Sequence, residues 1–400
     1  MKPIVIIPGI SGSILINKLK PYKELLGRKM LDNRWLNMKP YSFDSVTTWK
    51  KEIGLDIIED GNEKIVGMLE KCKDIGVYDL GGTKGICDIL PDLLLFNESQ
   101  QQFFENNYKF RYFHHMVKDL HKIGYHDHHN LFGIPYDFRL VLDPSYRITL
   151  FRQFKQYIEI ACKKNGEKCV IVTHSLGGIM FKWFLTEYVN QEWIDKHIHI
   201  FIPINTPFGG APFALKALIV GEYYVPFLQH IFRDEIQYVG GIIMCLPNYY
   251  AFGMDEPLWS YEYGDITLRD YKNFINEEKH ISFRIWNDLY KPYLPTIFKK
   301  ISVPTHVIVN NGQETPAVFK SKKLTDIPKQ LKSVMGDSIV TSNSLMCYEK
   351  IFDRNHVREL ITDVGDHISM ISDKKTIELV KEYGLGSRYK QHYIERHDEP

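Results

Sequence analysis

The sequence predicts an α/β fold with a mostly parallel, doubly wound sheet, and three observations support this prediction. A wholly apolar run at residues 4–7 is bounded by Pro8-Gly9, residues 150–188 have the pattern helix, strand, tight turn and helix, and isoleucines alternate through 198–204 before a late apolar run at 303–309. Strands that are apolar at every position are typical of parallel sheets covered by helices on both faces. At 400 residues the chain exceeds the size at which one core stops growing, so we expect one domain with insertions, or two domains.

The central unit of this fold lies between residues 150 and 188. Apolar residues recur at helical spacing through 150–162, and Asn165-Gly166 predicts the end of that helix. The apolar run at 169–173 predicts a strand, and the apolar positions at 179–188 predict the next helix. A strand between two helices is one βα unit of a doubly wound sheet.

Two segments interrupt the predicted core. Residues 206–299 are crowded with aromatic side chains and lack a strand–helix rhythm, which predicts a cap over the sheet. Residues 21–67 carry Trp35 without clear periodicity, so we expect a second inserted element or lid. The α/β core is then made of residues 1–20, 68–205 and 300–400.

The charge balance argues against several kinds of partner. The chain has 50 basic and 49 acidic residues, well interspersed, and a formal net charge of +1. This balance predicts no nucleic-acid partner and no basic patch for an anionic membrane. No apolar stretch approaches the ~18–20 residues of a spanning helix, and the first apolar run is shorter than the ~7–15 residues of a signal-peptide core. We therefore expect a cytoplasmic protein that meets a lipid surface peripherally, through exposed apolar side chains.

The sequence predicts no metal site and no cofactor. The six cysteines are mostly far apart and lack C-x-x-C pairing, which argues against a zinc ribbon or a dithiol redox site, so we expect mostly buried free thiols. Six clustered histidines leave metal binding as an alternative, although Gly124 and Asn130 beside them indicate a solvated loop. These histidines are His114, His115, His121, His126, His128 and His129.

A candidate nucleophile stands between the predicted strand and helix of the central unit. The segment Thr173-His174-Ser175-Leu176-Gly177-Gly178 occupies the position of a nucleophile elbow, the sharp turn that lifts a serine hydroxyl above the sheet of an α/β-hydrolase. Gly177 has the small size that the turn needs, whereas Thr173 replaces the usual glycine and predicts added strain. The alternative is that Ser175 only caps the helix that follows.

The C-terminal quarter supplies a base and an acid in the chain order serine, acid, histidine. His367 lies on a predicted loop just before a helix at 374–382 and is our candidate base for Ser175. Asp337, in a turn before an apolar segment, is the candidate acid. Asp363 and Asp366 are weaker alternatives, because close sequence neighbours of a histidine rarely reach its ring with good geometry.

The developing oxyanion of an attacked ester also needs hydrogen-bond donors. The backbone N–H groups of Leu176, after the nucleophile, and of Ile10, in the turn after the first predicted strand, are our candidates. The alternative is that Pro8-Gly9 simply turns the chain.

These motifs, in this order, resemble the lecithin:cholesterol acyltransferase family, which includes lysosomal A-type phospholipases and phospholipid:diacylglycerol acyltransferases. The resemblance spans most of the chain. It rests on VIIPGISGS at 5–13, GGTK at 81–84, PYDFR at 135–139, HSLG at 174–177, NTPFGG at 205–210, Gly336-Asp337 and Asp366-His367.

The resemblance implies a triad of Ser175, Asp337 and His367 with the amides of Ile10 and Leu176 as the oxyanion hole. It also implies a serine-dependent O-acyltransferase or phospholipase A-type enzyme. Such an enzyme takes an acyl chain from a phospholipid through an acyl-Ser175 intermediate and passes it to a sterol, a diacylglycerol, another alcohol or water.

For Trp35, the resemblance implies a place in a lid that covers the site and meets the bilayer; a tryptophan buried in the core is the alternative. The chain departs from the family at residues 17–67, which contain no cysteine for the usual lid disulfide, and at Gly336-Asp337-Ser338-Ile339-Val340, where the family has G-D-G-T-V. The competing functions are a carboxylesterase or lipase acting on simpler esters, and a lipid-binding protein without turnover.

Overall fold

The structure is a computed structural model that describes residues 1–19, 22–25, 28–31, 50–51, 54–87, 111–221, 229–276, 280–324 and 326–386. Trp35 lies outside the described residues, so its predicted place in a lid stays a prediction.

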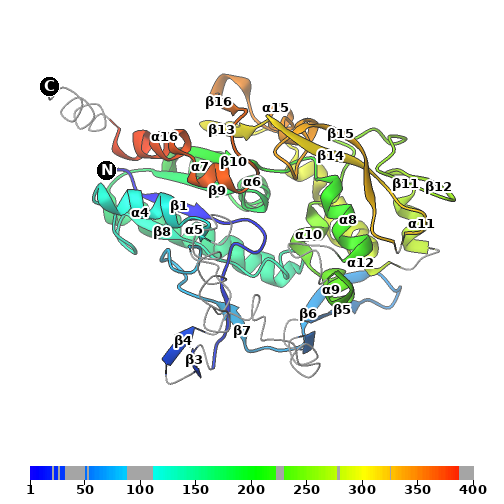
Figure 1. Cartoon of the computed structure of the whole chain (residues 1–400). Coiled ribbons are helices and arrows are strands. Elements are labelled where there is room, and N and C mark those ends of the chain that lie inside the picture. The colour runs from blue at the N-terminus through cyan, green and yellow to red at the C-terminus, as the bar shows by residue number, and fades with distance from the viewer. Residues whose placement is uncertain are drawn as a thin grey trace.

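A six-stranded sheet forms the centre of the molecule (Figure 1). Its order is β16-β13-β10-β9-β1-β8, and all of its pairings are parallel. The strands are β1 (Ile4–Ile7), β8 (Leu131–Gly133), β9 (Cys169–His174), β10 (Ile198–Ile204), β13 (Thr305–Asn310) and β16 (Val357–Thr362). This arrangement confirms the predicted fold class and the strands predicted at 4–7, 169–173, 198–204 and, within two residues, 303–309.

Helices cover both faces of this sheet, and alternate residues of each strand enter different cores. In β1, Val5 and Ile7 pack with α5 (Pro144–Asn165), α6 (Leu176–Glu187) and α7 (Gln191–His197). Ile4 and Ile6 pack with α4 (His114–Lys122) and α16 (Lys374–Leu385) on the other face. Because every position of β1 is buried, its sequence is apolar throughout.

Helix α5 begins six residues before the predicted start at 150. Asp143 caps it by accepting a hydrogen bond from the backbone N–H of Tyr146, and Pro144 occupies the first turn, where its missing N–H costs nothing. Gly166 ends the helix with a φ of 65°, as predicted from Asn165-Gly166. The predicted helix begins too late because it starts at the first apolar residue of the periodic pattern, whereas the Asp143-Pro144 start signal lies before that pattern.

A second sheet has the order β12-β11-β14-β15. Its strands are β11 (Trp259–Tyr261), β12 (Gly264–Ile266), β14 (Gln313–Lys320) and β15 (Lys329–Gly336). The hairpin β14–β15 belongs to the range predicted as core, yet β14 pairs with β11, which belongs to the range predicted as cap. The two ranges therefore share one sheet, and the division into core, lid and cap stays a prediction.

Three two-stranded sheets and several short helices complete the fold. The sheets are β2 (Leu15–Asn17) with β7 (Ile75–Val77), β3 (Tyr22–Leu25) with β4 (Arg28–Leu31), and β5 (Leu55–Glu59) with β6 (Ile65–Glu70). The helices are α8 (Pro212–Val220), α9 (Gln229–Ile236), α10 (Gly240–Met244), α11 (Tyr271–Asn276), α12 (Ile281–Ile285), α13 (Leu294–Ile297), α14 (Ser342–Leu345) and α15 (Tyr348–Ile351). Shorter π and 3-10 segments are η3 (Trp286–Tyr290), η4 (Lys291–Tyr293), η5 (Arg354–His356) and η6 (Ser369–Ser372).

All six cysteines are free thiols. Within the described ranges, no helix combines the length and the apolar character that crossing a bilayer requires.

Candidate active site

Ser175 stands on a sharp turn between β9 and α6. Its φ of 53° lies in the left-handed region, which is strained for a serine, and its N–H donates to the carbonyl of Ile204 at 3.0 Å. A Cβ at Gly177 would come within 2.4 Å of the carbonyl oxygen of Pro8, so only glycine fits there. Ser175 occupies the N-cap position of α6, but its side chain makes no capping hydrogen bond. The geometry is therefore that of a nucleophile elbow rather than a simple helix cap.

Thr173 does not add the backbone strain that its sequence position predicts. It is a regular residue of β9, paired with Ile7 and Pro203, and its φ is not positive. The side chain is fully buried, and its hydroxyl has no hydrogen-bond partner. Thr173 therefore destabilises the fold through a buried hydroxyl without a hydrogen-bond partner, and not through a strained φ.

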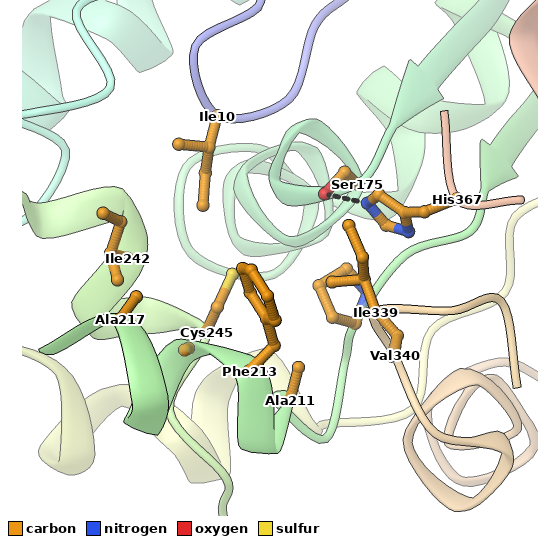
Figure 2. Close-up of a pocket in the computed structure, with 12 residues that line it drawn as sticks. Ile10, Ser175, Ala211, Phe213, Ala217, Ile242, Cys245, Ile339, Val340 and His367 are labelled. Atoms are coloured by element: carbon orange, nitrogen blue, oxygen red, sulfur yellow. Dashed lines mark hydrogen bonds between the residues drawn. The ribbon is translucent and has the colours of Figure 1, made fainter. Parts of the chain in front are cut away.

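The imidazole of His367 lies between Ser175 and Asp337. Its Nε2 is 3.0 Å from Ser175 Oγ, and its Nδ1 is 2.6 Å from Asp337 Oδ2 (Figure 2 shows the first contact). The three side chains come from three places in the fold, namely the end of β9, the loop after β16 and the end of β15. The structure thus brings together the three residues that the sequence proposes as nucleophile, base and acid.

The Asp337 side chain is fixed from several directions and is fully buried. Its Oδ1 accepts the N–H groups of Ile339 at 3.0 Å and Val340 at 2.7 Å, and its backbone carbonyl accepts the N–H of His367 at 2.7 Å. Ser338 has a φ of 79°, at the position where the family pattern has glycine. Ser338 therefore adopts the left-handed conformation that a glycine would adopt more easily at this position.

The two rival carboxylates have other surroundings. The Asp366 Oδ1 accepts the backbone N–H groups of Ile368 and Ser369, at the start of η6. Asp363 is exposed. The carboxylate in hydrogen-bond contact with His367 is that of Asp337.

The proposed oxyanion donors lie next to the elbow. A Cβ at Gly9, the residue before Ile10, would approach the Ser175 Cβ to 2.8 Å, so the turn and the elbow are in close contact. Among the described residues, neither the Ile10 nor the Leu176 N–H donates a hydrogen bond to another group. Both amides are therefore available to a substrate oxygen.

His174, the residue before the nucleophile, links the turn that carries Ile10 to His367. Its Nε2 lies 2.8 Å from the carbonyl oxygen of His367, which only accepts, so Nε2 carries the proton. Nδ1 then accepts from the Tyr112 hydroxyl at 2.7 Å, and that hydroxyl oxygen accepts the N–H of Gly9 at 2.8 Å. Burial, with a smaller contribution from His367, lowers the pKa of His174 to about 3, so the ring stays neutral.

Asn205 supports the same loop from the neighbouring strand. Its Nδ2 donates to the carbonyl of His367 at 3.2 Å, and its Oδ1 accepts the N–H of Asn310 at 2.8 Å. Asn205 has a φ of 44°, which asparagine tolerates better than most residues. His174 and Asn205 belong to motifs that the sequence singles out, but their contact with His367 has no sequence signal, and Tyr112 has none at all.

An apolar pocket opens beside Ser175 and His367. Its lining comes mainly from α8, α10, the turn at Ile10 and the segment after Asp337: Ile10, Pro207, Ala211, Phe213, Ala214, Ala217, Ile242, Cys245, Ile339 and Val340. Figure 2 shows the Phe213 ring in the middle of this lining, next to Cys245. The cavity of about 40 Å³ holds only a few water molecules, so a longer ligand requires Phe213 or its neighbours to move.

The histidine cluster has different partners. His121 Nε2 lies 3.3 Å from Asp127 Oδ1, and His128 Nε2 lies 3.5 Å from Asp79 Oδ1. Within the described ranges, no group of three or more histidine, cysteine or acidic side chains is arranged to hold a metal ion.

Comparison with known proteins shows which family the chain resembles. Residues 98–288 match the sequence profile described as Lecithin:cholesterol acyltransferase. The lysosomal phospholipase A and acyltransferase of Bos taurus is 26% identical over 286 residues, which cover 69% of this chain and 68% of that protein. The phosphatidylcholine-sterol acyltransferase of Gallus gallus is 25% identical over 280 residues, which cover 67% of this chain and 65% of that protein.

Among solved structures, a chain of the Tle4–Tli4 complex superposes with a TM-score of 0.58 at 11% identity, covering 97% of this chain and 98% of that one. This likeness concerns the fold alone. The profile match includes Ser175 but ends before Asp337 and His367, so the pairing of acid and base rests on the distances above. The chain is thus similar to the lecithin:cholesterol acyltransferase family over residues 98–288, and to phospholipase and acyltransferase relatives over about two thirds of its length.

Proposed function

We propose that this protein is a serine-dependent O-acyltransferase or A-type phospholipase. It takes an acyl chain from a phospholipid and passes it to an alcohol, such as a sterol or a diacylglycerol, or to water. The observation that supports this proposal most is the 3.0 Å contact between Ser175 Oγ and His367 Nε2 beside an apolar pocket. The names of the relatives, phospholipase A and acyltransferase, support a phospholipid as the acyl donor.

In the first half-reaction, His367 Nε2 takes the proton of Ser175 as its Oγ attacks the acyl carbonyl. The amides of Ile10 and Leu176 stabilise the oxyanion, and Asp337 stabilises the imidazolium through Nδ1. His367 then gives the proton to the leaving lysophospholipid oxygen, which leaves an acyl ester on Ser175. The acyl chain occupies the pocket lined by α8 and α10 once Phe213 or its neighbours have moved.

In the second half-reaction, an alcohol or water attacks the acyl-Ser175 ester. His367 removes the proton of the acceptor and returns it to Ser175 Oγ as the ester breaks. The same machinery therefore serves hydrolysis and transfer, and the acceptor that enters decides between them.

Contact with a lipid surface is peripheral in this proposal. The cytoplasmic location stays a prediction.

A product analysis tests the proposal. Purified protein is incubated with a phospholipid that carries a labelled acyl chain, together with sterol, diacylglycerol and water, and the labelled products are identified. We expect labelled fatty acid, sterol ester or triacylglycerol, and none with Ser175→Ala. Turnover of short-chain p-nitrophenyl esters without any phospholipid product would identify a simple carboxylesterase instead, and vesicle binding without turnover of either substrate would identify a lipid-binding protein.

A further inference from the structure

The hairpin of β14 and β15 carries a local excess of positive charge around its turn. Residues 320–332 contain five lysines and one aspartate, although the whole chain has a net charge of only +1. The five lysines are all exposed: Lys320, Lys322, Lys323, Lys329 and Lys332. The balanced composition of the chain therefore hides a basic segment that the whole-chain charge does not predict.

These lysines have no acidic partner within the described part of the chain. The single acid of the segment, Asp326, accepts the backbone N–H of Lys323 at 2.8 Å and so holds the turn. Some exposed lysines elsewhere do form ion pairs, as Lys122 does with Asp119 at 2.7 Å. The positive charge of the segment is thus available to an external partner.

Exposed apolar side chains accompany the lysines. Ile327, Leu331 and Met335 are 60%, 50% and 51% exposed. Leu331 and Met335 both belong to β15, in which a register shift against β14 falls at Leu331. Exposed apolar side chains interleaved with unpaired lysines are typical of surfaces that bind lipid interfaces.

The position of this surface connects it with the candidate site. β15 is an edge strand of its sheet, and its last residue, Gly336, directly precedes Asp337. Figure 1 shows β14 and β15 as a long ribbon that reaches toward β11 and β12. Val364, close in sequence to His367, is also 63% exposed, so apolar side chains flank both the acid and the base.

We infer that residues 320–324 and 326–335 form a docking surface for a bilayer that contains anionic phospholipid. The ammonium groups contact lipid phosphates, and Ile327 and Leu331 enter the interface beside them. The inference rests on the proposed function for the kind of partner, because an enzyme that acts on phospholipid must meet a bilayer. It reverses the expectation of charge-independent contact: binding should weaken as salt is added.

The test measures vesicle binding separately from turnover. In the Ser175→Ala background, sedimentation with phosphatidylcholine vesicles, with and without phosphatidylglycerol, is compared between two triple variants of equal charge. The hairpin variant is Lys322→Gln/Lys323→Gln/Lys332→Gln, and the control variant is Lys196→Gln/Lys374→Gln/Lys375→Gln, at exposed lysines of other elements.

We expect the hairpin variant to lose at least about tenfold in affinity for the anionic vesicles, and the control to lose much less. Added salt should remove this difference. Equal losses in the two variants, or no preference of the parent protein for anionic vesicles, would overturn the inference. Binding to polyglutamate but to no vesicle would assign the surface to an acidic protein partner and would overturn it as well.

Turnover separates this inference from the proposed function. With Ser175 intact, the hairpin variant should hydrolyse a soluble short-chain ester at the wild-type rate and anionic vesicle phospholipid more slowly. If wild-type protein binds anionic vesicles through the hairpin but turns over no phospholipid, the proposed function fails and the docking surface stands. If the hairpin variant turns over vesicle phospholipid at the wild-type rate, the docking surface fails and the proposed function stands.

Discussion

The two sheets support their candidate catalytic residues in different ways. In the six-stranded sheet, every residue of β9 is buried, and the elbow at Ser175 is enclosed by the strands beside it. In the four-stranded sheet, β15 is exposed or half-buried along its length, and burial begins only at Gly336 and Asp337. The acid therefore stands at the buried end of a strand that is otherwise at the surface.

This difference indicates how the site and the surface can be tuned separately. Changes at the elbow disturb close backbone contacts at once, as the 2.4 Å approach at Gly177 shows. Changes along the outer part of β15 leave the hydrogen bonds of Asp337 to Ile339, Val340 and His367 in place. The four-stranded sheet can therefore carry a binding surface at one end and a catalytic carboxylate at the other.

The largest effect is expected at the elbow. Ser175→Ala removes only the nucleophilic oxygen, so turnover should fall by about 10⁶-fold, as in a comparable triad. His367→Ala should be nearly as damaging, and the double variant little worse than either, because the three groups act as a unit. Steady-state rates on a soluble ester measure this, and circular dichroism checks the fold. Losses that multiply in the double variant would indicate a different base.

The matching change in the four-stranded sheet is Asp337→Asn. It keeps the shape of the side chain but presents the wrong partner to His367 Nδ1, so kcat should fall by up to about 10⁴-fold. Asp363→Asn and Asp366→Asn serve as controls and should retain most activity. If one of these controls shows the large loss and Asp337→Asn does not, the acid has been assigned to the wrong sheet.

The apolar pocket beside Ser175 allows a test of acyl-chain specificity. Phe213→Ala removes the ring that fills the middle of the lining and so enlarges the cavity beside Ser175. We expect kcat/KM to shift toward longer acyl chains by about tenfold, the value of one to two kcal/mol of apolar contact. A series of esters of increasing chain length measures it, with Ala217→Val as an opposite change that should favour shorter chains. An unchanged chain-length profile in both variants would place the acyl chain elsewhere.

The buried His174 of the six-stranded sheet should make the free energy of unfolding depend on pH. Its pKa is about 3 in the folded protein and about 6.5 when exposed, so below pH 6.5 only the unfolded chain takes up the proton. The free energy of unfolding should therefore fall as the pH drops from about 6.5 toward 3, by at most about 1.4 kcal/mol per pH unit from this residue. Denaturant unfolding of the wild type and His174→Gln checks this, because the variant should depend less on pH. Equal slopes would mean that His174 is protonated in the folded state.

The smallest effect concerns the turn after the acid. Ser338→Gly relieves a positive φ and leaves the hydrogen bonds of Asp337 with Ile339, Val340 and His367 in place. It should raise the free energy of unfolding by about 1 kcal/mol with little change in kcat. Ser338→Ala keeps the strain and is the control. A loss of stability in the glycine variant would show that the serine side chain supports the turn.

The contrast between the sheets also explains what the sequence could predict. Residues 4–7 and 169–173 are recognisable because both faces of their strands are buried, and Ser175 is recognisable because the elbow needs small residues in fixed places. β14 and β15 are not recognisable, because an exposed strand with register shifts and many lysines has no regular apolar alternation. The links from Tyr112 and Asn205 to the site join distant parts of the chain, and a single sequence has no signal for such contacts.

The most direct test of the central claim is to trap the acyl-enzyme. Wild-type protein and the Ser175→Ala variant are mixed with phosphatidylcholine that carries labelled acyl chains, quenched in acid during turnover, digested, and examined by mass spectrometry. We predict one acyl ester, on the peptide that contains Ser175, in the wild type and none in the variant. An acyl group on another residue, or acyl transfer by Ser175→Ala at the wild-type rate, would contradict the account.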